Sequence, residues 1–248
     1  MGALLYKRRT MTHTATNPIF CALDTTALPE AVAWARAVKP YVGGLKVGLE
    51  FFNANGPQGV RAIAEIGLPV FADLKLHDIP NTVSGGIRAA MSLGISIINV
   101  HASGGAAMMR AAAEAAATAG PSRPKVIGVT LLTSLDQSDL QAIGVSGSPS
   151  DQVLRLATLA RSSGLDGVVC AAHEIAMLRR ELGPDFMLIV PGIRPAGAAT
   201  ADQKRVMTPR QAHQLGADIL VVGRPITGAA DPAAAARAIR DDLVSAAA

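Results

Sequence analysis

A short pattern recurs along this chain and constrains its fold more than any other feature. A helix-like segment ends at a glycine, one to three residues follow, and an apolar run rich in β-branched residues begins. Glycine closes helices in the left-handed conformation, and near-continuous apolar strands are typical of a parallel sheet that is covered on both faces. The pattern predicts a repeated unit of strand and helix. It occurs at Ile66–Val70, Leu93–Ile98, Ser163–Val169, Leu182–Ile189 and Leu215–Val221.

The number of such strands predicts the fold class. With helical patterns between them, eight strand–helix units predict an α/β protein, a single (β/α)8 TIM barrel, whose chemistry would lie at the carboxyl ends of the strands. A doubly wound sheet is the alternative. No linker divides the 248 residues, so we expect a flexible leader over residues 1–17 and one catalytic barrel domain over residues 18–248. The expected strands are Ile19–Leu23, Gly44–Val47, Val70–Leu74, Ile97–Val100, Lys125–Val129, Gly167–Val169, Leu188–Val190 and Ile219–Val222.

Composition excludes several classes of protein. Half of the residues are apolar, but no uninterrupted apolar run approaches the roughly 18 residues that cross a bilayer. The basic run Lys7–Arg9 follows a short apolar segment instead of preceding it, unlike a secretory signal. Cys21 and Cys170 form neither a metal-site spacing nor a disulfide framework. We therefore expect no membrane association and a reducing, cytoplasmic location.

The net charge of +4 raises the possibility of a nucleic-acid partner. Only eight aromatic residues are present, however, and the lysines and arginines are scattered along the chain. A small anionic ligand explains the excess of positive charge equally well, so we expect no nucleic-acid partner.

Polar residues fall where a closed barrel would place its chemistry, just after the strands. Only the sixth strand, which is followed by Cys170–His173, offers little. The residues at the other strand ends are Asp24, Lys46, Asp73, Lys75, Asn99, His101, Thr133, Ser134, Arg194, Gly223 and Arg224.

The run Phe71–Thr82 is the strongest candidate for a catalytic site. On a strand, Asp73 and Lys75 are two residues apart and so project to one face, and Asp78 follows where the chain turns into a helix. A buried lysine needs an opposite charge, and flanking carboxylates keep its ammonium protonated, as a proton donor requires. The alternative is a structural ion pair, with Asp78 as a helix N-cap and Pro80 near the first helical position.

Asp24 and Lys46 have weaker individual signals. Asp24 could simply cap a turn or the helix that begins near Leu28. Lys46 lies inside an apolar strand, where an ammonium must either extend to solvent or meet a carboxylate. This constraint favours a site role for Lys46.

Two segments late in the chain suit a phosphate group. Gly223–Thr227 opens a helix, so backbone N–H groups, the helix dipole and the Arg224 guanidinium could bind a dianion; an ordinary turn is the alternative. The long segment Pro191–Met207 carries Arg194 and Gln203 and leads to Thr208–Pro209, a candidate N-cap and first helical residue. Its length favours a lid over a passive loop.

The histidines do not indicate a metal site. His77 and His101 belong to no metal-ligand spacing, so we interpret them as hydrogen-bonded structural residues. His173 and His213 lie in helical segments and are expected to be solvated, and Met108 and Met109 are expected to pack in a core or an interface.

Taken in order along eight strands, these motifs resemble the orotidine 5′-phosphate decarboxylase family, from about Pro18 to the C-terminus. The Asp-x-Lys-x-x-Asp pattern at Asp73–Asp78 is shared with a wider group of barrels that bind sugar phosphates. Its extension to Thr82, together with Pro191–Pro195 and Val222–Pro225, is highly specific.

The resemblance implies decarboxylation of orotidine 5′-phosphate to uridine 5′-phosphate and CO2, the last step of de novo UMP synthesis, without a metal or another cofactor. Lys75 would protonate the C6 carbanion, and Asp73 would face the substrate carboxylate. Asp78 and its neighbours would enter the site of the other subunit of a homodimer. The implied catalytic and substrate-binding residues are Asp24, Lys46, Asp73, Lys75, Asp78, Ile79, Thr82, Thr133, Pro191, Arg194, Gln203, Gly223 and Arg224.

Two other functions stay open at this point. A metal-dependent sister enzyme on the same barrel, such as a keto-gulonate-phosphate decarboxylase or a hexulose-phosphate synthase, would need an acidic constellation for Mg²⁺. A non-catalytic barrel that binds phosphate or RNA would not depend on Lys75, and its affinity for RNA would fall steeply with salt.

Overall fold

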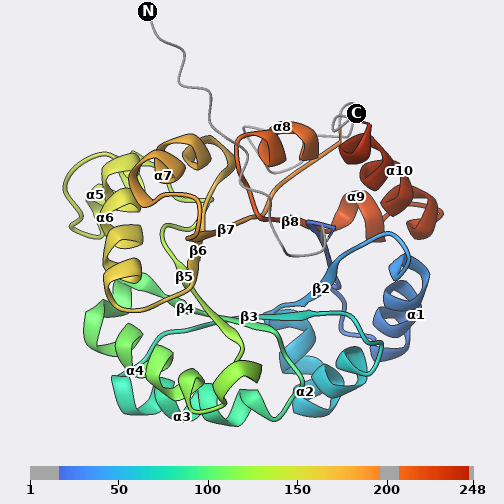
Figure 1. The fold of residues 1–248 in the computed structure, drawn as a ribbon, viewed down its shortest axis with the longest axis horizontal. Coiled ribbons are helices and arrows are strands. Elements are labelled where there is room, and N and C mark those ends of the chain that lie inside the picture. The colour runs from blue at the N-terminus through green and yellow to red at the C-terminus, as the bar shows by residue number, and fades with distance from the viewer. Residues whose placement is uncertain (1–16, 196–206, 246–248) are drawn as a thin grey trace, which may run out of the picture.

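The computed structural model describes residues 17–195 and 207–245, and within them eight parallel strands form a closed barrel in chain order (Figure 1). β1 pairs with both β2 and β8, which closes the sheet and confirms the (β/α)8 barrel over the doubly wound alternative. Residues 1–16 of the expected leader lie outside the described part of the chain. The strands are β1 Ile19–Ala22, β2 Gly44–Val47, β3 Val70–Leu76, β4 Ile97–His101, β5 Lys125–Val129, β6 Gly167–Val169, β7 Met187–Val190 and β8 Ile219–Val222.

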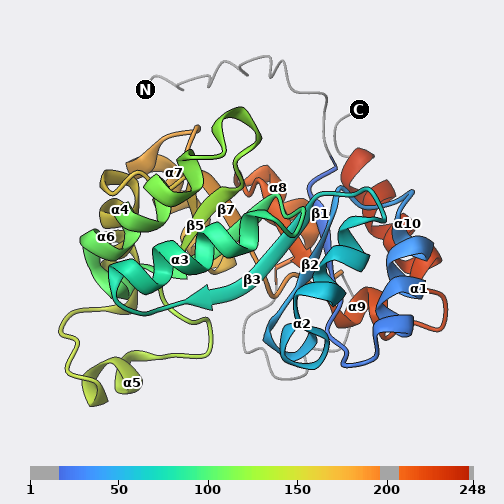
Figure 2. The same cartoon turned by 90° about the horizontal axis from the view of Figure 1, so that it is seen from below.

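Helices follow the strands and surround the barrel (Figure 1). The short helix α5 lies on an excursion that projects away from the barrel wall (Figure 2). The α-helices are α1 Leu28–Val38, α2 Leu49–Ala64, α3 Pro80–Met91, α4 Gly105–Ala117, α5 Gln137–Ala142, α6 Pro149–Ser162, α7 Ile175–Leu182, α8 Pro209–Gln214, α9 Arg224–Thr227 and α10 Pro232–Val244, with 3₁₀ turns η1 Ala102–Gly104, η2 Gly120–Ser122 and η3 Ala172–Glu174.

The glycines of the recurring pattern have the backbone conformation that the sequence predicts. All five have positive φ, the region that glycine enters without a steric penalty. The helix-closing role of these glycines is thereby confirmed. The values are 81° at Gly67, 74° at Gly94, 84° at Gly164, 76° at Gly183 and 107° at Gly216.

The interior of the barrel is filled by side chains, so the barrel has a core and no channel. Phe20, Phe71 and Ile127 belong to one buried cluster inside the strands, and burial of each such side chain stabilises the fold by about 1.5–3 kcal/mol. Gly44 makes room for this buried cluster, because a Cβ at position 44 would lie 2.4 Å from the Phe20 ring. A second, larger apolar layer lies between strands and helices. Since the interior is closed, any pocket must form at an end of the barrel.

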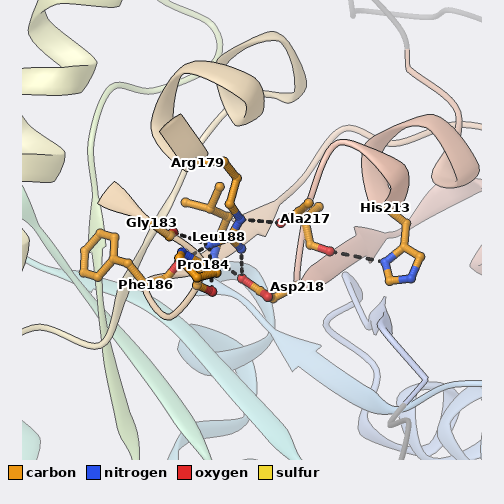
Figure 3. A network of polar contacts seen from close by, with 9 residues as sticks. Arg179, Gly183, Pro184, Phe186, Leu188, His213, Ala217 and Asp218 are labelled. Atoms are coloured by element: carbon orange, nitrogen blue, oxygen red, sulfur yellow. Dashed lines mark hydrogen bonds and ion pairs between the residues drawn. The ribbon is translucent and has the colours of Figure 1, made fainter. Parts of the chain in front are cut away.

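The amino end of the barrel is held together by an arginine clamp. Arg179, at the end of α7, pairs with Asp218, and its Nε donates to the carbonyl of Gly216 at 2.8 Å. Its Nη1 donates to the Phe186 carbonyl at 2.6 Å, so the guanidinium lies between the turns that precede β7 and β8 (Figure 3). Asp218 also accepts the backbone N–H of Leu188 at 2.7 Å. The clamp joins β7 to β8.

A second clamp repeats this arrangement between β5 and β6. Asp166 accepts both Arg123 Nη atoms at 2.7 Å and the backbone N–H of Val126 at 2.9 Å. Lys125 Nζ lies 3.1 Å from the same carboxylate. Burial raises the pKa of Asp166, but the hydrogen bonds from Arg123, Val126 and Lys125 outweigh it and hold the pKa below its usual range.

Two further observations concern the cysteines and the helices. Both cysteines are buried free thiols, as their isolated positions in apolar runs suggested. No helix in residues 17–195 or 207–245 combines the length and apolarity needed to cross a membrane.

Candidate active site

A pocket of about 320 Å³ opens at the carboxyl ends of the strands. Its wall has an apolar part, which includes Val129, Val169, Ile189 and Val221 of β5 to β8. Its charged residues lie on β2 and β3 and in the segments that follow β1, β7 and β8. The residues expected at the site that line the pocket are Asp24, Lys46, Asp73, Lys75, Thr133, Pro191, Arg194, Gly223 and Arg224.

Four charged groups form an alternating row along one side of the pocket. Lys46, only 8% exposed, lies with its Nζ 3.0 Å from Asp24 Oδ1 and 3.6 Å from Asp73 Oδ2. Lys75 Nζ lies 2.6 Å from Asp73 Oδ1 and ends the row. Lys46 therefore meets carboxylates instead of extending to solvent. Asp24 does not cap α1, whose N-cap is Ala27.

Asp73 lies in this row between the two lysines, Lys46 and Lys75. Burial raises the pKa of its carboxyl group, but the charges of Lys46 and Lys75 and hydrogen bonds from Lys75 and Asn99 lower the pKa below its ordinary value. A carboxylate between two ammonium groups compensates both of them, so the row is electrostatically stable in a partly buried place.

The backbone around Lys75 differs from the regular strand that the sequence suggested. Asp73 and Lys75 do meet, but Lys75 has a φ of 51°, the only positive φ at a described non-glycine residue. The pairing of β3 with β4 also shifts register between Ala72 and Leu76. A bulge, and not simple alternation along a strand, therefore directs the Lys75 side chain.

Asn99 has a contact role that the sequence did not indicate. It is fully buried on β4, its Nδ2 donates to Asp73 Oδ1 at 2.7 Å, and its Oδ1 accepts the backbone N–H of Lys75 at 2.7 Å. One feature of the sequence could have indicated this role. Asn99 lies two residues after Ile97 and therefore on the same face of β4, which points into the barrel. Its neutral amide gave no reason to assign a role.

Candidate anion-binding groups lie at a different part of the pocket wall. Arg194 follows β7 and is only 7% exposed, and Arg224 begins α9 directly after Gly223. Gln203 lies outside the described residues, as does most of the expected lid. Its far end is as expected, because Thr208 is the N-cap of α8, with Pro209 in its first turn and a capping box to Gln211.

Asp78, Ile79 and Thr82 do not line the pocket of their own chain. All three are exposed, Ile79 to 67%. The alternative interpretation of Asp78 as an N-cap is wrong: Ile79 occupies that position, and Asp78 Oδ1 accepts the Ile79 N–H at 2.6 Å. The chain needs one more extended residue before Pro80, because a residue that precedes proline avoids the helical conformation.

The histidines beside the site contact each other. The rings of His77 and His101 lie 5.4 Å apart. Burial, then the neighbouring His77 and Lys75 charges, lowers the pKa of His101. In the described parts of the chain, no cluster of three or more His, Cys, Asp or Glu side chains is placed to hold a metal ion.

Comparisons with known proteins identify the family. Residues 17–239 match the model of the Orotidine 5'-phosphate decarboxylase / HUMPS family. A protein of Rhodospirillum rubrum named orotidine 5′-phosphate decarboxylase is 54% identical over 233 residues, which cover 92% of this chain and 94% of that protein. A counterpart from Anaeromyxobacter is 55% identical over 91% of this chain and 97% of its own.

A solved structure gives the same result. The crystal structure of orotidine 5′-phosphate decarboxylase from Lactobacillus acidophilus is 38% identical, covers 92% of this chain and 99% of that chain, and superposes with a TM-score of 0.81. By sequence and by fold, this chain belongs to the Orotidine 5'-phosphate decarboxylase / HUMPS family.

Proposed function

We propose that this chain removes CO2 from orotidine 5′-phosphate and releases uridine 5′-phosphate, the last step of pyrimidine nucleotide synthesis. As a member of its family it is an enzyme, a carboxy-lyase. The observation that supports this reaction most strongly is the row Asp24–Lys46–Asp73–Lys75 on the wall of a pocket, in a chain that shares about half its residues with relatives named for this activity.

The proposed chemistry is electrostatic. Loss of CO2 from C6 leaves a carbanion that the pyrimidine ring delocalises poorly, so a fixed positive charge must stabilise it. Within the described residues, Lys75 Nζ has one hydrogen-bond partner, Asp73, and it lines the pocket. We assign Lys75 to stabilise the developing charge and then to protonate C6. No step of this scheme requires a metal or another cofactor.

The neighbouring charges have supporting roles in this proposal. Asp73 would lie near the departing carboxylate and hold the Lys75 ammonium in place, while Lys46 compensates the second oxygen of Asp73. Asp24 and Lys46 would bind ribose hydroxyls, and Thr133 would contact the pyrimidine or its ribose. The apolar wall at Val169, Ile189 and nearby residues offers dry surface for the base.

The phosphate would bind at the part of the pocket wall that follows β7 and β8. Arg194, Gly223 and Arg224 line the pocket there, beside Pro191. We propose that Gln203 and the segment between Arg194 and Thr208 complete this site as a lid. Binding energy from a remote phosphate accelerates the reaction when it is used to close the site around the reacting groups.

We also propose a homodimer in which Asp78, Ile79 and Thr82 complete the partner's site. All three are exposed on the described chain, Ile79 to 67%, so a second subunit can reach them. The test mixes two inactive variants, Lys75→Ala and Asp78→Ala. A mixed dimer has one intact site if Asp78 acts across the interface, so activity returns on mixing. Continued inactivity of a verified mixed dimer would refute the shared site.

The central test is an ultraviolet assay of orotidylate loss in the presence of a metal chelator. We expect turnover by the wild type and a fall in kcat on the order of 10²–10⁴-fold for Lys75→Ala, with an unchanged circular dichroism spectrum. Lys125→Ala is the matched control, because it removes a lysine from the opposite end of the barrel. Turnover of orotidylate in chelator excludes a metal-dependent sister activity. No turnover would favour either that activity or a non-catalytic phosphate-binding barrel.

A further inference from the structure

The strand that carries the catalytic pair contains extra residues opposite a single position of its neighbour. Ala72 of β3 lies opposite Ile98 of β4, and Leu76 lies opposite Val100. Four residue steps on β3 therefore match two steps on β4. Asp73 and Lys75, together with the residue between them, all lie opposite Asn99.

Such a bulge leaves backbone groups without their usual partners in the sheet. The Lys75 N–H is one of them, and Lys75 also has a φ of 51°, which is unfavourable for a residue with a side chain. Asn99 Oδ1 accepts this N–H at 2.7 Å. The side chain of Asn99 thus replaces a backbone acceptor and stabilises the conformation that aims Lys75 at the pocket.

The other half of the same amide binds the catalytic carboxylate. Asn99 Nδ2 donates to Asp73 Oδ1 at 2.7 Å, and the same oxygen accepts Lys75 Nζ at 2.6 Å. An amide supplies a donor and an acceptor from one planar group at these two places, whereas an ionised carboxylate supplies acceptors alone. Asn99 is fully buried and does not line the pocket. Its hydrogen bonds are to Asp73 and to the Lys75 backbone.

We propose that Asn99 is a positioning residue for the decarboxylation: one buried amide holds the β3 bulge, orients Asp73 Oδ1 and sets the backbone direction of Lys75. This inference rests on the function proposed above. It adds a neutral group on β4 to the row Asp24–Lys46–Asp73–Lys75. Without this group, Asp73 and Lys75 would be misaligned.

The expected effect on turnover follows from geometry. Asn99→Ala leaves the Lys75 N–H without its acceptor and Asp73 without one donor, so we expect kcat to fall on the order of 100-fold, as for small misplacements of reacting groups, with little change in KM. The control is Ile98→Val, on the same strand and fully buried but facing away from Asp73. It should reduce stability without reducing kcat.

A pH profile separates positioning from mere structural support. The hydrogen bond from Asn99 lowers the pKa of Asp73, so its loss should move the acid limb of the kcat/KM profile to higher pH in Asn99→Ala. In Asn99→Asp the new carboxylate can still accept the Lys75 N–H, but it can donate to Asp73 only when protonated. The activity of this variant relative to the wild type should therefore rise as the pH falls. The charged or titratable groups around Asp73 in these experiments are Asp24, Lys46, Lys75, His77 and His101.

A measurement on the free protein distinguishes this inference from the proposed function. Carbon-13 NMR titration of the Asp73 carboxyl group should give a higher pKa in Asn99→Ala than in the wild type, whether or not orotidylate is the substrate. If a folded Asn99→Ala variant keeps the wild-type kcat and the wild-type pKa of Asp73, the inference is overturned. If Asn99→Ala does not fold, the nearly isosteric Asn99→Asp decides, and a pH profile parallel to that of the wild type would refute the positioning role. Absence of turnover in the wild type would instead refute the proposed function alone.

Discussion

The two ends of the barrel carry the same kinds of charged group but arrange them differently. At the amino end, Asp218 and Asp166 each bind an arginine and a backbone N–H of the adjoining strand. The other N–H groups of Arg179 donate to backbone carbonyls. At the carboxyl end, Lys46 and Lys75 are compensated by carboxylates, and the row of charges faces a pocket.

The difference shows how one fold separates stability from function. A charge whose hydrogen bonds go to the backbone stabilises one arrangement of the chain and has nothing left for a ligand. A charge that is balanced mainly by other side chains, in a pocket, keeps donors or acceptors for a substrate. Position relative to the strand follows the same division, since Asp166 and Asp218 precede their strands, whereas Asp73 lies within β3, toward the end at which the pocket opens.

The largest expected effect comes from the same substitution made at each end. Asp73→Asn removes the negative charge between Lys46 and Lys75, so we expect kcat/KM for orotidylate to fall on the order of 10²–10⁴-fold while the protein stays folded. Asp218→Asn should leave the kinetics at 25 °C unchanged and lower the melting temperature. Equal kinetic losses in the two variants would show that the ends are not functionally distinct.

The second prediction concerns the clamp itself. Arg179→Ala leaves Asp218 and several carbonyls without their donor in a mostly buried place. Removal of one partner of a buried pair costs about 3–5 kcal/mol, which should lower the melting temperature by roughly 6–20 °C in a domain of this size. Differential scanning calorimetry measures the loss. An Arg179→Ala protein with wild-type stability would mean that the clamp contributes nothing measurable.

The third and smallest prediction concerns Glu174, which follows β6 but lies outside the pocket lining. Burial raises its pKa to about 7, despite a hydrogen bond from the Ala171 N–H. Because the folded-state pKa lies above that of the unfolded chain, this group contributes its stability at low pH, and the contribution is lost as pH rises from about 4.5 to about 7.

Glu174→Gln removes that pH dependence. Relative to the wild type, the variant should gain up to about 3 kcal/mol of unfolding free energy at pH 8 and much less at pH 5, as urea titrations at the two pH values would reveal. An equal effect at both values would mean that Glu174 does not titrate in this range. Glu174 is thus a third kind of charged group in this barrel: a buried carboxylate with a backbone donor and with His173 Nε2 at 3.5 Å, but without an arginine.

Most of the fold was predictable because its signals are local. A helix that ends in glycine, followed by an apolar strand, is encoded within a few residues, and each expected strand boundary lies within two residues of the observed one. The largest difference is at β3, which continues past Leu74 to Leu76. Its irregular end is where the local signal fails.

The candidate site was predictable to a different extent. Parallel strands in a barrel all point one way, so polar residues at their ends must gather at one rim, and nine of the expected residues line one pocket. Asp78, Ile79 and Thr82 do not, since completion of the site by a second subunit is not a property of one chain. Asn99 was expected at the end of its strand but lies fully buried inside β4, and its role depends on partners that a sequence does not show.

By itself, the sequence determined the order of strands and helices, the end of the barrel where chemistry gathers and the acids and bases found there. Only the tertiary structure decided how these groups are aimed: the bulge in β3, the left-handed backbone of Lys75 and the Asn99 amide that holds both. The reason is distance along the chain. Asn99 lies 24 and 26 residues from the two groups it binds, and contacts at that separation arise only when β3 pairs with β4.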